Sequence, residues 1–334
     1  MIPFPGKNRQ PTQTPQAAPP ANLGLWWTYV KERCPLASYA LLSVGIAWSP
    51  LVLSGLKPEV FGVLWASVLV FAFFVLLRLM DEVKDYRKDV IAHPERPLPR
   101  GLFRVEDAQR GVQWGLLTLW TFSVVTFLLF GLTAGVLYGL TTGYLYLMYR
   151  EFFCGPQLDR VPLAYAASHQ AILFLLGATA AACHSSFAAP GLFTAMQTPP
   201  LGFFLASLQI FPAFFAYEVG RKMDPKAPEI LKYYRSVYGL FGCRLILSGL
   251  AAMGLGALWF GLTKGAAVLG PLTEPGQEGP ALGPLVWMTG ASLGWIVVGG
   301  ATWFAGDKRF GWIALATTLN LLLALYTPIL AYYL

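Results

Sequence analysis

The chain has 334 residues, of which 56% are hydrophobic and 12% are charged, with a formal net charge of +7. Soluble domains contain about 25% charged residues, so this composition excludes an ordinary soluble protein and indicates a multi-pass membrane protein. The four cysteines form no CxxC pair, which indicates neither a zinc site nor a disulfide framework. No soluble module combines basic and aromatic residues, so we expect no nucleic-acid partner. No obligatory protein partner is evident either.

The amino-terminal residues differ from the rest of the chain. Residues 1–24 are rich in Pro and Gln and lack an apolar core, which predicts a disordered tail and not a signal peptide. Trp26 and Trp27, followed by Lys31 and Arg33, are typical of an anchor at a membrane interface. We expect residues 25–334 to form one transmembrane domain.

Long apolar stretches of about 20 residues, each sufficient to cross a bilayer as a helix, occupy most of that domain. Their continuity favours an all-α membrane protein, a bundle of about nine transmembrane helices, and not a β-barrel of short alternating strands. The predicted spans are 36–55, 59–80, 108–131, 133–150, 162–183, 199–218, 237–262, 282–304 and 311–333.

Lys and Arg residues gather on one side of these spans. The opposite loops hold few of them, with Lys57 and Lys264 as exceptions. The positive-inside rule therefore places the amino terminus and both large polar loops in the cytoplasm, and we expect a protein of the bacterial cytoplasmic membrane. The basic side suits an anionic substrate or an anionic lipid surface. Its residues are Lys7, Arg9, Lys31, Arg33, Lys84, Arg87, Lys88, Arg96, Arg100, Arg104, Arg221, Lys222, Lys226, Lys232, Arg235, Lys308 and Arg309.

The first polar segment, residues 81–102, begins with a run of acids after the second span. Asp81, Asp85 and Asp89 recur at every fourth position, so on a helix that continues the span they share one face. Like charges at this spacing repel unless cations lie nearby. Carboxylates suit Mg²⁺, which takes one or two of them together with waters and substrate phosphates. The run predicts a metal-diphosphate site with ligands Asp81, Glu82, Asp85 and Asp89; the alternative is a solvated helix with internal ion pairs.

The same segment continues with Pro94, Pro97 and Pro99, which exclude a helix and favour a rigid extended path. Arg96 and Arg100 would then be held in place, and guanidinium groups fit phosphate oxygens in a bidentate manner. We expect these two arginines to bind the diphosphate.

The second polar segment, residues 217–229, follows the sixth span and again mixes acids with bases. Glu218 and Lys222 lie four residues apart, with Arg221 between them, so they emerge at one helix end. We expect Arg221 and Lys222 to bind diphosphate, or alternatively to contribute only positive-inside charge. A second set of metal ligands would come from Glu218, Asp224 and Glu229.

These segments resemble the UbiA superfamily of intramembrane prenyltransferases. The first motif of that family runs Asn-Asp-x-x-Asp-x-x-x-Asp and is followed by a stretch ending Arg-Pro-Leu-Pro-x-Gly. This chain reads Asp81-Glu82-x-x-Asp85-x-x-x-Asp89 and then Arg96-Pro97-Leu98-Pro99-Arg100-Gly101. The resemblance covers residues 36–333. It implies a helical prenyltransferase whose polar loops cap the active site and whose first motif binds magnesium and an isoprenyl diphosphate.

Two features depart from the family pattern. Asp81-Glu82 replaces Asn-Asp, and the second segment offers Glu218 to Glu229 where the family usually has Asp-x-x-x-Asp. Together with the stretch Leu147 to Phe153, the second segment resembles a less characterised branch of the superfamily. Arg221 and Lys222 can then hold phosphate in place of a second metal.

Polar residues inside spans are further candidates, because they are costly in hydrocarbon. His169 and Gln170 in the fifth span and Asn320 in the ninth either belong to the site or form hydrogen bonds between helices. Arg150 and Glu151 close the fourth span near the expected site.

The resemblance implies Mg²⁺-dependent transfer of an isoprenyl group to a lipophilic or aromatic acceptor in the bilayer. Asp85, Asp89 and Lys84 would take part in catalysis, with the metal and bases neutralising the leaving diphosphate. The alternatives are a membrane terpene cyclase that acts on the diphosphate alone and a carrier for an anionic lipid or metabolite.

Overall fold

The computed structural model describes residues 18–53, 58–158, 160–184, 201–231, 233–265, 282–304 and 310–333. The predictions for residues 1–17 and for Lys57, Lys232, Lys308 and Arg309 lie outside these ranges. Within them the regular structure is helical, as predicted. The elements in chain order are α1 (Leu23–Arg33), α2 (Leu36–Leu53), α3 (Val60–Lys84), α4 (Tyr86–Ala92), α5 (Val105–Phe130), α6 (Leu132–Tyr149), η1 (Glu151–Phe153), α7 (Gly155–Leu158), α8 (Pro162–Gln170), α9 (Ile172–Ala182), α10 (Leu201–Arg221), η3 (Glu229–Leu231), α11 (Tyr234–Gly265), α12 (Leu282–Phe304) and α13 (Phe310–Tyr333).

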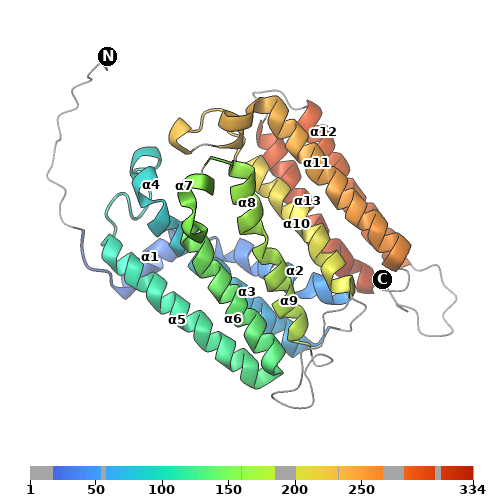
Figure 1. Ribbon diagram of the computed structural model, residues 1–334, viewed down its shortest axis with the longest axis horizontal. Coiled ribbons are helices and arrows are strands. Elements are labelled where there is room, and N and C mark those ends of the chain that lie inside the picture. The colour runs from blue at the N-terminus through green and yellow to red at the C-terminus, as the bar shows by residue number, and fades with distance from the viewer. Residues whose placement is uncertain are drawn as a thin grey trace.

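The long helices lie side by side in a bundle (Figure 1). In the described residues, six stretches are long and apolar enough to cross a membrane: α2, α3, α5, α8 with α9, α11 as far as Trp259, and α13. Helices α6, α10 and α12 coincide with the other three predicted spans. The structure is therefore that of a multi-pass membrane protein, while the count of nine spans stays a prediction.

Helices α3 and α10 position the polar residues, and both pack against α2 and α9. Helix α3 also contacts α5 and α6, where the Tyr138 hydroxyl donates to the Leu69 carbonyl oxygen at 3.0 Å. The contact with α9 requires a glycine, because a Cβ on Gly62 would lie 2.3 Å from the Cys183 carbonyl oxygen. Close packing of this kind fixes the depth of α3 in the bundle.

Helix α1 begins at Leu23, inside the range that the sequence assigned to a disordered tail. The Asn22 side chain caps it by accepting from the Leu25 amide at 3.0 Å. The preceding residues contact the first turn of α5, where the Ala21 amide donates to Asp107 Oδ2 at 2.9 Å. Trp26 packs on Phe103 with ring centroids 4.6 Å apart. These contacts place α1 and the residues before it against the start of α5.

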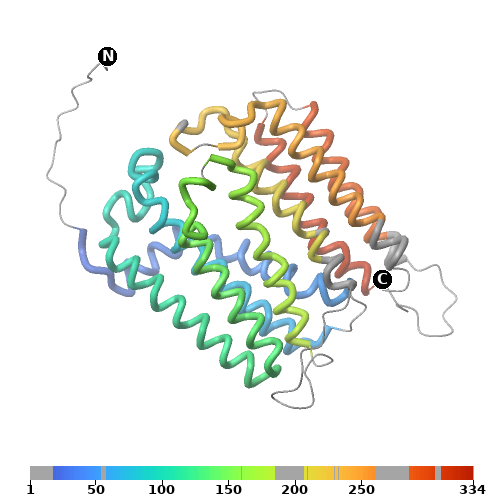
Figure 2. The backbone as a smooth tube through the Cα atoms, viewed as in Figure 1, coloured from blue at the N-terminus to red at the C-terminus, as the bar shows by residue number. Residues whose placement is uncertain are grey.

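Both polar segments lie at the same end of the bundle (Figure 2). Helix α4, in the first segment, contacts η3, which begins at the last residue of the second. The structure therefore brings together two parts of the chain that are more than one hundred residues apart in sequence.

Candidate functional site

The first polar segment contains a break in the helix. Helix α3 ends at Lys84, and Asp85 adopts φ −89° and ψ 4° before α4 begins at Tyr86. The expectation that one uninterrupted helix displays Asp81, Asp85 and Asp89 along one face is therefore wrong. Asp81 pairs with Lys84, whereas Asp89 pairs with Arg96.

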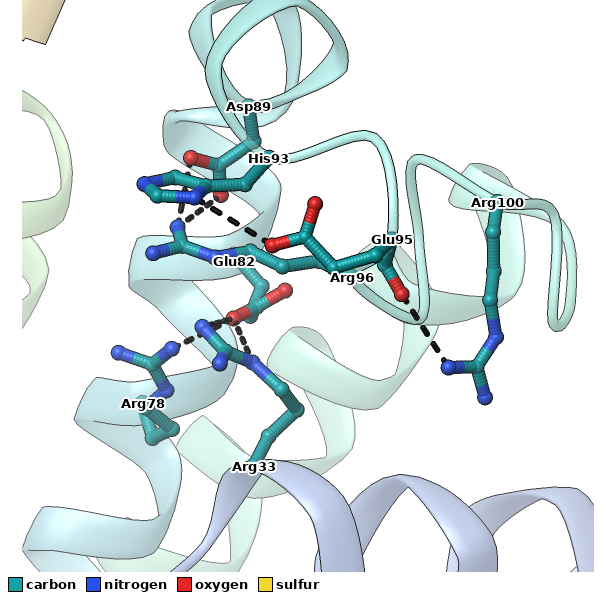
Figure 3. Close-up of polar contacts among 8 residues, drawn as sticks. All are labelled: Arg33, Arg78, Glu82, Asp89, His93, Glu95, Arg96 and Arg100. Carbon is teal, nitrogen blue, oxygen red and sulfur yellow. Dashed lines mark hydrogen bonds and ion pairs between the residues drawn. The ribbon is translucent and has the colours of Figure 1, made fainter. Parts of the chain in front are cut away.

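Glu82 lies at the centre of an arginine cluster and is 2% exposed. Its Oε1 accepts from Arg33 Nε at 2.5 Å and from Arg78 Nη2 at 2.7 Å, so α1 and α3 are joined at this point (Figure 3). Arg33 Nη2 also forms an ion pair with the same oxygen. A carboxylate held by two guanidinium groups is poorly placed to bind a metal, which differs from the predicted role of Glu82.

Asp89 also forms an ion pair with an arginine. Its two carboxylate oxygens accept from Arg96 Nη1 at 2.6 and 2.7 Å, and Asp89 is 3% exposed. This contact fixes the proline-containing part of the segment to α4. Arg100 points away from the cluster in Figure 3 and instead pairs with Glu32 of α1 at 2.8 Å. That contact lowers the pKa of Glu32. The structure therefore brings Arg96, but not Arg100, next to the acid run.

Lys84 joins α3 to α8, and the two remaining acids lie near it. Lys84 Nζ donates to the Tyr165 hydroxyl at 2.9 Å and lies 3.4 Å from Asp81 Oδ1. Asp85 lies close enough to interact electrostatically with Lys84 and Tyr165. Burial raises the pKa of Asp85 above its usual value, and the charge of Lys84 opposes that shift. A further cation bound next to Asp85 would favour the ionised form of its carboxylate.

The second polar segment forms its own ion pairs. Glu218 Oε2 accepts from Arg221 Nη2 at 2.7 Å, and Lys222 Nζ lies 2.5 Å from Glu218 Oε1. Asp224 is used locally, since its Oδ1 accepts from the Lys226 amide at 2.8 Å in the turn after α10. Glu229 begins η3, and its side chain lies outside the described residues. Arg221 and Lys222 therefore pair with a single carboxylate, that of Glu218, and the three side chains together carry a net positive charge.

Groups from the two segments meet through α2 and α8. His169 on α8 lies near enough to Lys84, Asp81 and Lys222 to interact electrostatically with all of them. Tyr39 on α2 does the same with Asp81 and Arg221. The candidate site is thus a cluster of acids and bases from α3 and α10, lined by aromatic rings and an imidazole. We define the inner cluster as Asp81, Lys84, Asp85, Tyr165, His169, Glu218, Arg221 and Lys222.

The inner cluster fits magnesium in a limited way. Among the described residues, no group of three or more His, Cys, Asp or Glu side chains is arranged to hold a metal ion. Mg²⁺ commonly takes one or two carboxylates and completes its shell with water and substrate phosphate. Asp81 and Asp85, which interact with each other and with Lys84, fit an ion that binds together with a diphosphate. Glu82 and Asp89 fit less well, because Arg33 and Arg78 hold Glu82 Oε1 and Arg96 holds both oxygens of Asp89.

Sequence reasoning missed several partners in these contacts. Arg78 lies one turn before Glu82 in an apolar span, and a charged residue at such a position is itself a signal of function or pairing. Tyr165 carries no such signal, because it resembles any other aromatic residue in a span. Of the other candidates, Asn320 is buried in α13, and its Nδ2 has no hydrogen-bond partner in the described part of the chain. Gln170 ends α8, and Arg150 stacks on Phe153 at 5.6 Å.

No family model matches the chain, and no curated protein matches it by sequence. Two solved structures are similar in fold. A UbiA homologue from Aeropyrum pernix K1 in its apo form aligns with a TM-score of 0.61 and 15% identity, covering 89% of this chain and 98% of the homologue. The chain has the UbiA fold. A digeranylgeranylglyceryl phosphate synthase aligns over 93% of this chain and 100% of its own length, with a TM-score of 0.56 and 12% identity. The resemblance seen in the motifs is confirmed at the level of the fold.

Proposed function

We propose that the protein catalyses the Mg²⁺-dependent transfer of an isoprenyl group from a polyprenyl diphosphate to an acceptor, with an aromatic acceptor favoured, within the membrane. One observation carries the proposal: acids and bases from α3, α8 and α10 form one cluster at the polar end of a bundle that has the UbiA fold. Mixed charge of this kind suits a metal-bound diphosphate.

In the inner cluster, the acids would bind the metal and the basic residues would bind phosphate. Asp81 and Asp85 would hold magnesium, which when bound neutralises the leaving diphosphate as a Lewis acid. Lys84, Arg221 and Lys222 supply direct positive charge to phosphate oxygens, as amino and guanidinium groups do elsewhere. Arg96 and Asp89 would order the segment that covers the diphosphate.

The apolar parts of the substrates are placed by the membrane itself. A prenyl chain is soluble between helices in the bilayer, whereas the diphosphate is not, so the reaction would occur where the polar end of the bundle meets the membrane surface. We propose that this end faces the bacterial cytoplasm, because Lys and Arg gather there. Exposed aromatic and aliphatic side chains on α5 and α6 suit contact with lipid.

The alternative within the same chemistry is a terpene cyclase, in which the prenyl chain itself captures the allylic cation. A carrier for an anionic lipid or metabolite is favoured less, because the two polar segments lie at one end of the bundle and not at its middle (Figure 1).

The test is diphosphate release by the purified protein in detergent. Geranyl, farnesyl and geranylgeranyl diphosphates are supplied with magnesium or EDTA, and with or without 4-hydroxybenzoate. Magnesium-dependent release that requires the acceptor supports the transferase, and release without it supports the cyclase. Asp85→Asn should reduce release by at least about 100-fold, in line with loss of a charge-stabilising group. Glu106→Gln, an exposed acid at the start of α5, is the matched control. Absence of release from every donor would overturn the proposal.

A further inference from the structure

The imidazole of His169 has one nitrogen engaged and one free. His169 Nδ1 lies 2.8 Å from the Tyr165 carbonyl oxygen, and a carbonyl oxygen can only accept, so Nδ1 carries the proton in this hydrogen bond. In the neutral ring the lone pair then lies on Nε2. That atom is buried and has no hydrogen-bond partner in the described part of the chain. Buried polar atoms without partners are rare, and each calls for a reason.

Aromatic rings hold the imidazole in its orientation. Tyr165 stacks on it with centroids 4.1 Å apart and planes 16° apart, and Phe152 meets it edge-on at 5.6 Å. Tyr144 packs on Phe152 and donates through its hydroxyl to the Ser168 carbonyl oxygen at 2.6 Å. A ring fixed from two sides keeps Nε2 aimed in one direction, as required of a group that must meet a substrate atom.

The turn that carries Phe152 is strained. Glu151, Phe152 and Phe153 have φ values of 49°, 52° and 58°, a left-handed conformation that residues with a Cβ adopt rarely. Strain of this kind persists where the surrounding structure enforces it and is concentrated at functional sites. Here it sets the Phe152 ring against His169.

His169 also lies within the inner cluster. Lys84 and Lys222 interact with it electrostatically from α3 and from the end of α10, and Asp81 does so from α3. The helix is interrupted one residue beyond Gln170, at Ala171, before α9 begins. A basic nitrogen next to the groups that would hold a diphosphate is well placed to act on the second substrate.

We propose that His169 Nε2 accepts the proton of a hydroxyl group on the acceptor, so the acceptor is a phenol or an alcohol. This inference rests on the proposed transferase function. The bond between the first prenyl carbon and the diphosphate oxygen breaks, and its electron pair leaves with the diphosphate. The acceptor oxygen forms the new bond to that carbon, and its proton passes to Nε2. The resulting imidazolium lies near the diphosphate. The negative charge of the diphosphate offsets the positive charges of Lys84 and Lys222, which would otherwise repel the imidazolium.

The test uses the full chain in detergent with geranylgeranyl diphosphate and magnesium. 4-Hydroxybenzoate represents phenols and monoolein represents alcohols, while 4-methoxybenzoate lacks the hydroxyl proton. Transfer product and diphosphate are measured separately over a range of pH. General base catalysis contributes about 100- to 10,000-fold, so His169→Gln and His169→Phe should reduce transfer at least about 100-fold. The donor KM should change less than about threefold, because the imidazole does not bind the donor.

Two further readouts separate this role from a structural one. Wild-type transfer should fall at acid pH as the imidazole takes up a proton, and both variants should lose that limb of the pH profile. Asn320→Ala removes another buried polar group without a hydrogen-bond partner at its Nδ2, on α13, and should leave the profile unchanged. Transfer to 4-hydroxybenzoate or to monoolein, but not to 4-methoxybenzoate, tells which hydroxyl class is used.

Other outcomes overturn the inference. Variants that transfer at the wild-type rate, or whose donor KM rises by as much as their transfer rate falls, would show that Nε2 is not the proton acceptor. Wild-type protein that releases diphosphate without transferring to either hydroxyl compound would show the same. Wild-type protein that releases no diphosphate would overturn the proposed function, and the inference with it.

Discussion

Replacing Glu82 by Gln separates a structural carboxylate from a metal ligand. The side chain of Glu82 is 1% exposed and accepts from Arg33 and Arg78 at 2.5 and 2.7 Å. Hydrogen bonds to charged groups contribute about 1.5–3 kcal/mol each, and breaking a buried ion pair costs about 3–5 kcal/mol. The arginine side chains are 17% and 22% exposed, so water recovers part of this loss, and Gln keeps one acceptor oxygen. We expect the free energy of unfolding to fall by about 2–3 kcal/mol, roughly 30- to 150-fold in the equilibrium constant.

The assay is unfolding by SDS in mixed micelles, followed by far-ultraviolet circular dichroism, with diphosphate release normalised to folded protein. The neighbouring Asp81→Asn is the matched control. Asp81 is 40% exposed in its side chain and lies 3.4 Å from Lys84, so its loss should cost less than about 1 kcal/mol. It should nevertheless reduce magnesium-dependent turnover at least about 100-fold. The reasoning is refuted if Glu82→Gln unfolds like the wild type but loses turnover that excess magnesium restores.

Further predictions concern a thiol, a hydroxyl and a close helix contact. Burial, together with the negative charge of Glu82, raises the pKa of the Cys34 thiol to about 11. Alkylation of Cys34 by N-ethylmaleimide at pH 8, followed by peptide mass spectrometry, should therefore be roughly 100-fold slower than that of a free thiol. Equal rates would contradict this prediction. Tyr165→Phe removes the hydroxyl that accepts from Lys84 and should raise the donor KM about fivefold, corresponding to about 1 kcal/mol, whereas an unchanged KM would argue against a diphosphate contact by this lysine. Gly62→Ala forces α3 away from a backbone carbonyl oxygen after α9 and should lower the free energy of unfolding by about 1–3 kcal/mol, with Gly143→Ala, where a Cβ meets nothing within 4 Å, as the control that should not.

The helices were predictable because apolar runs of bilayer length have few other uses in a chain of this composition. What hydropathy could not predict is where such runs are interrupted. The predicted span 162–183 consists of α8 and α9, which are separated at Ala171, directly after the polar residues His169 and Gln170. Similarly, α3 continues past the predicted end at residue 80 as far as Lys84. Hydropathy, which averages over a window of residues, records neither the interruption nor the extension.

The candidate site was predictable in its location but not in its partners. The spacing of the acids and the excess of bases on one side indicated correctly that both polar segments lie at one end of the bundle. One partner of Glu82, however, is Arg33 of α1, 49 residues away in sequence. Arg33 was interpreted as part of a membrane anchor, because a basic residue at the end of an interfacial helix is usually that. Only the folded structure shows that this helix lies against α3.

The helix break at Asp85 explains how one short run of acids can serve two purposes. Glu82 and Asp89 face α1 and the proline-containing segment, where Arg33, Arg78 and Arg96 neutralise them. Their negative charge therefore contributes little to the inner cluster. Asp81 and Asp85 remain there with Lys84 as their close cation, together with Arg221 and Lys222, which share the one acid Glu218. A diphosphate carries several negative charges and can be balanced by one metal held by two carboxylates together with these bases, without a second set of acidic ligands. The second segment has Arg221 and Lys222 where the family usually has acids. This fits a first segment in which arginines neutralise two of the four acids, Glu82 and Asp89.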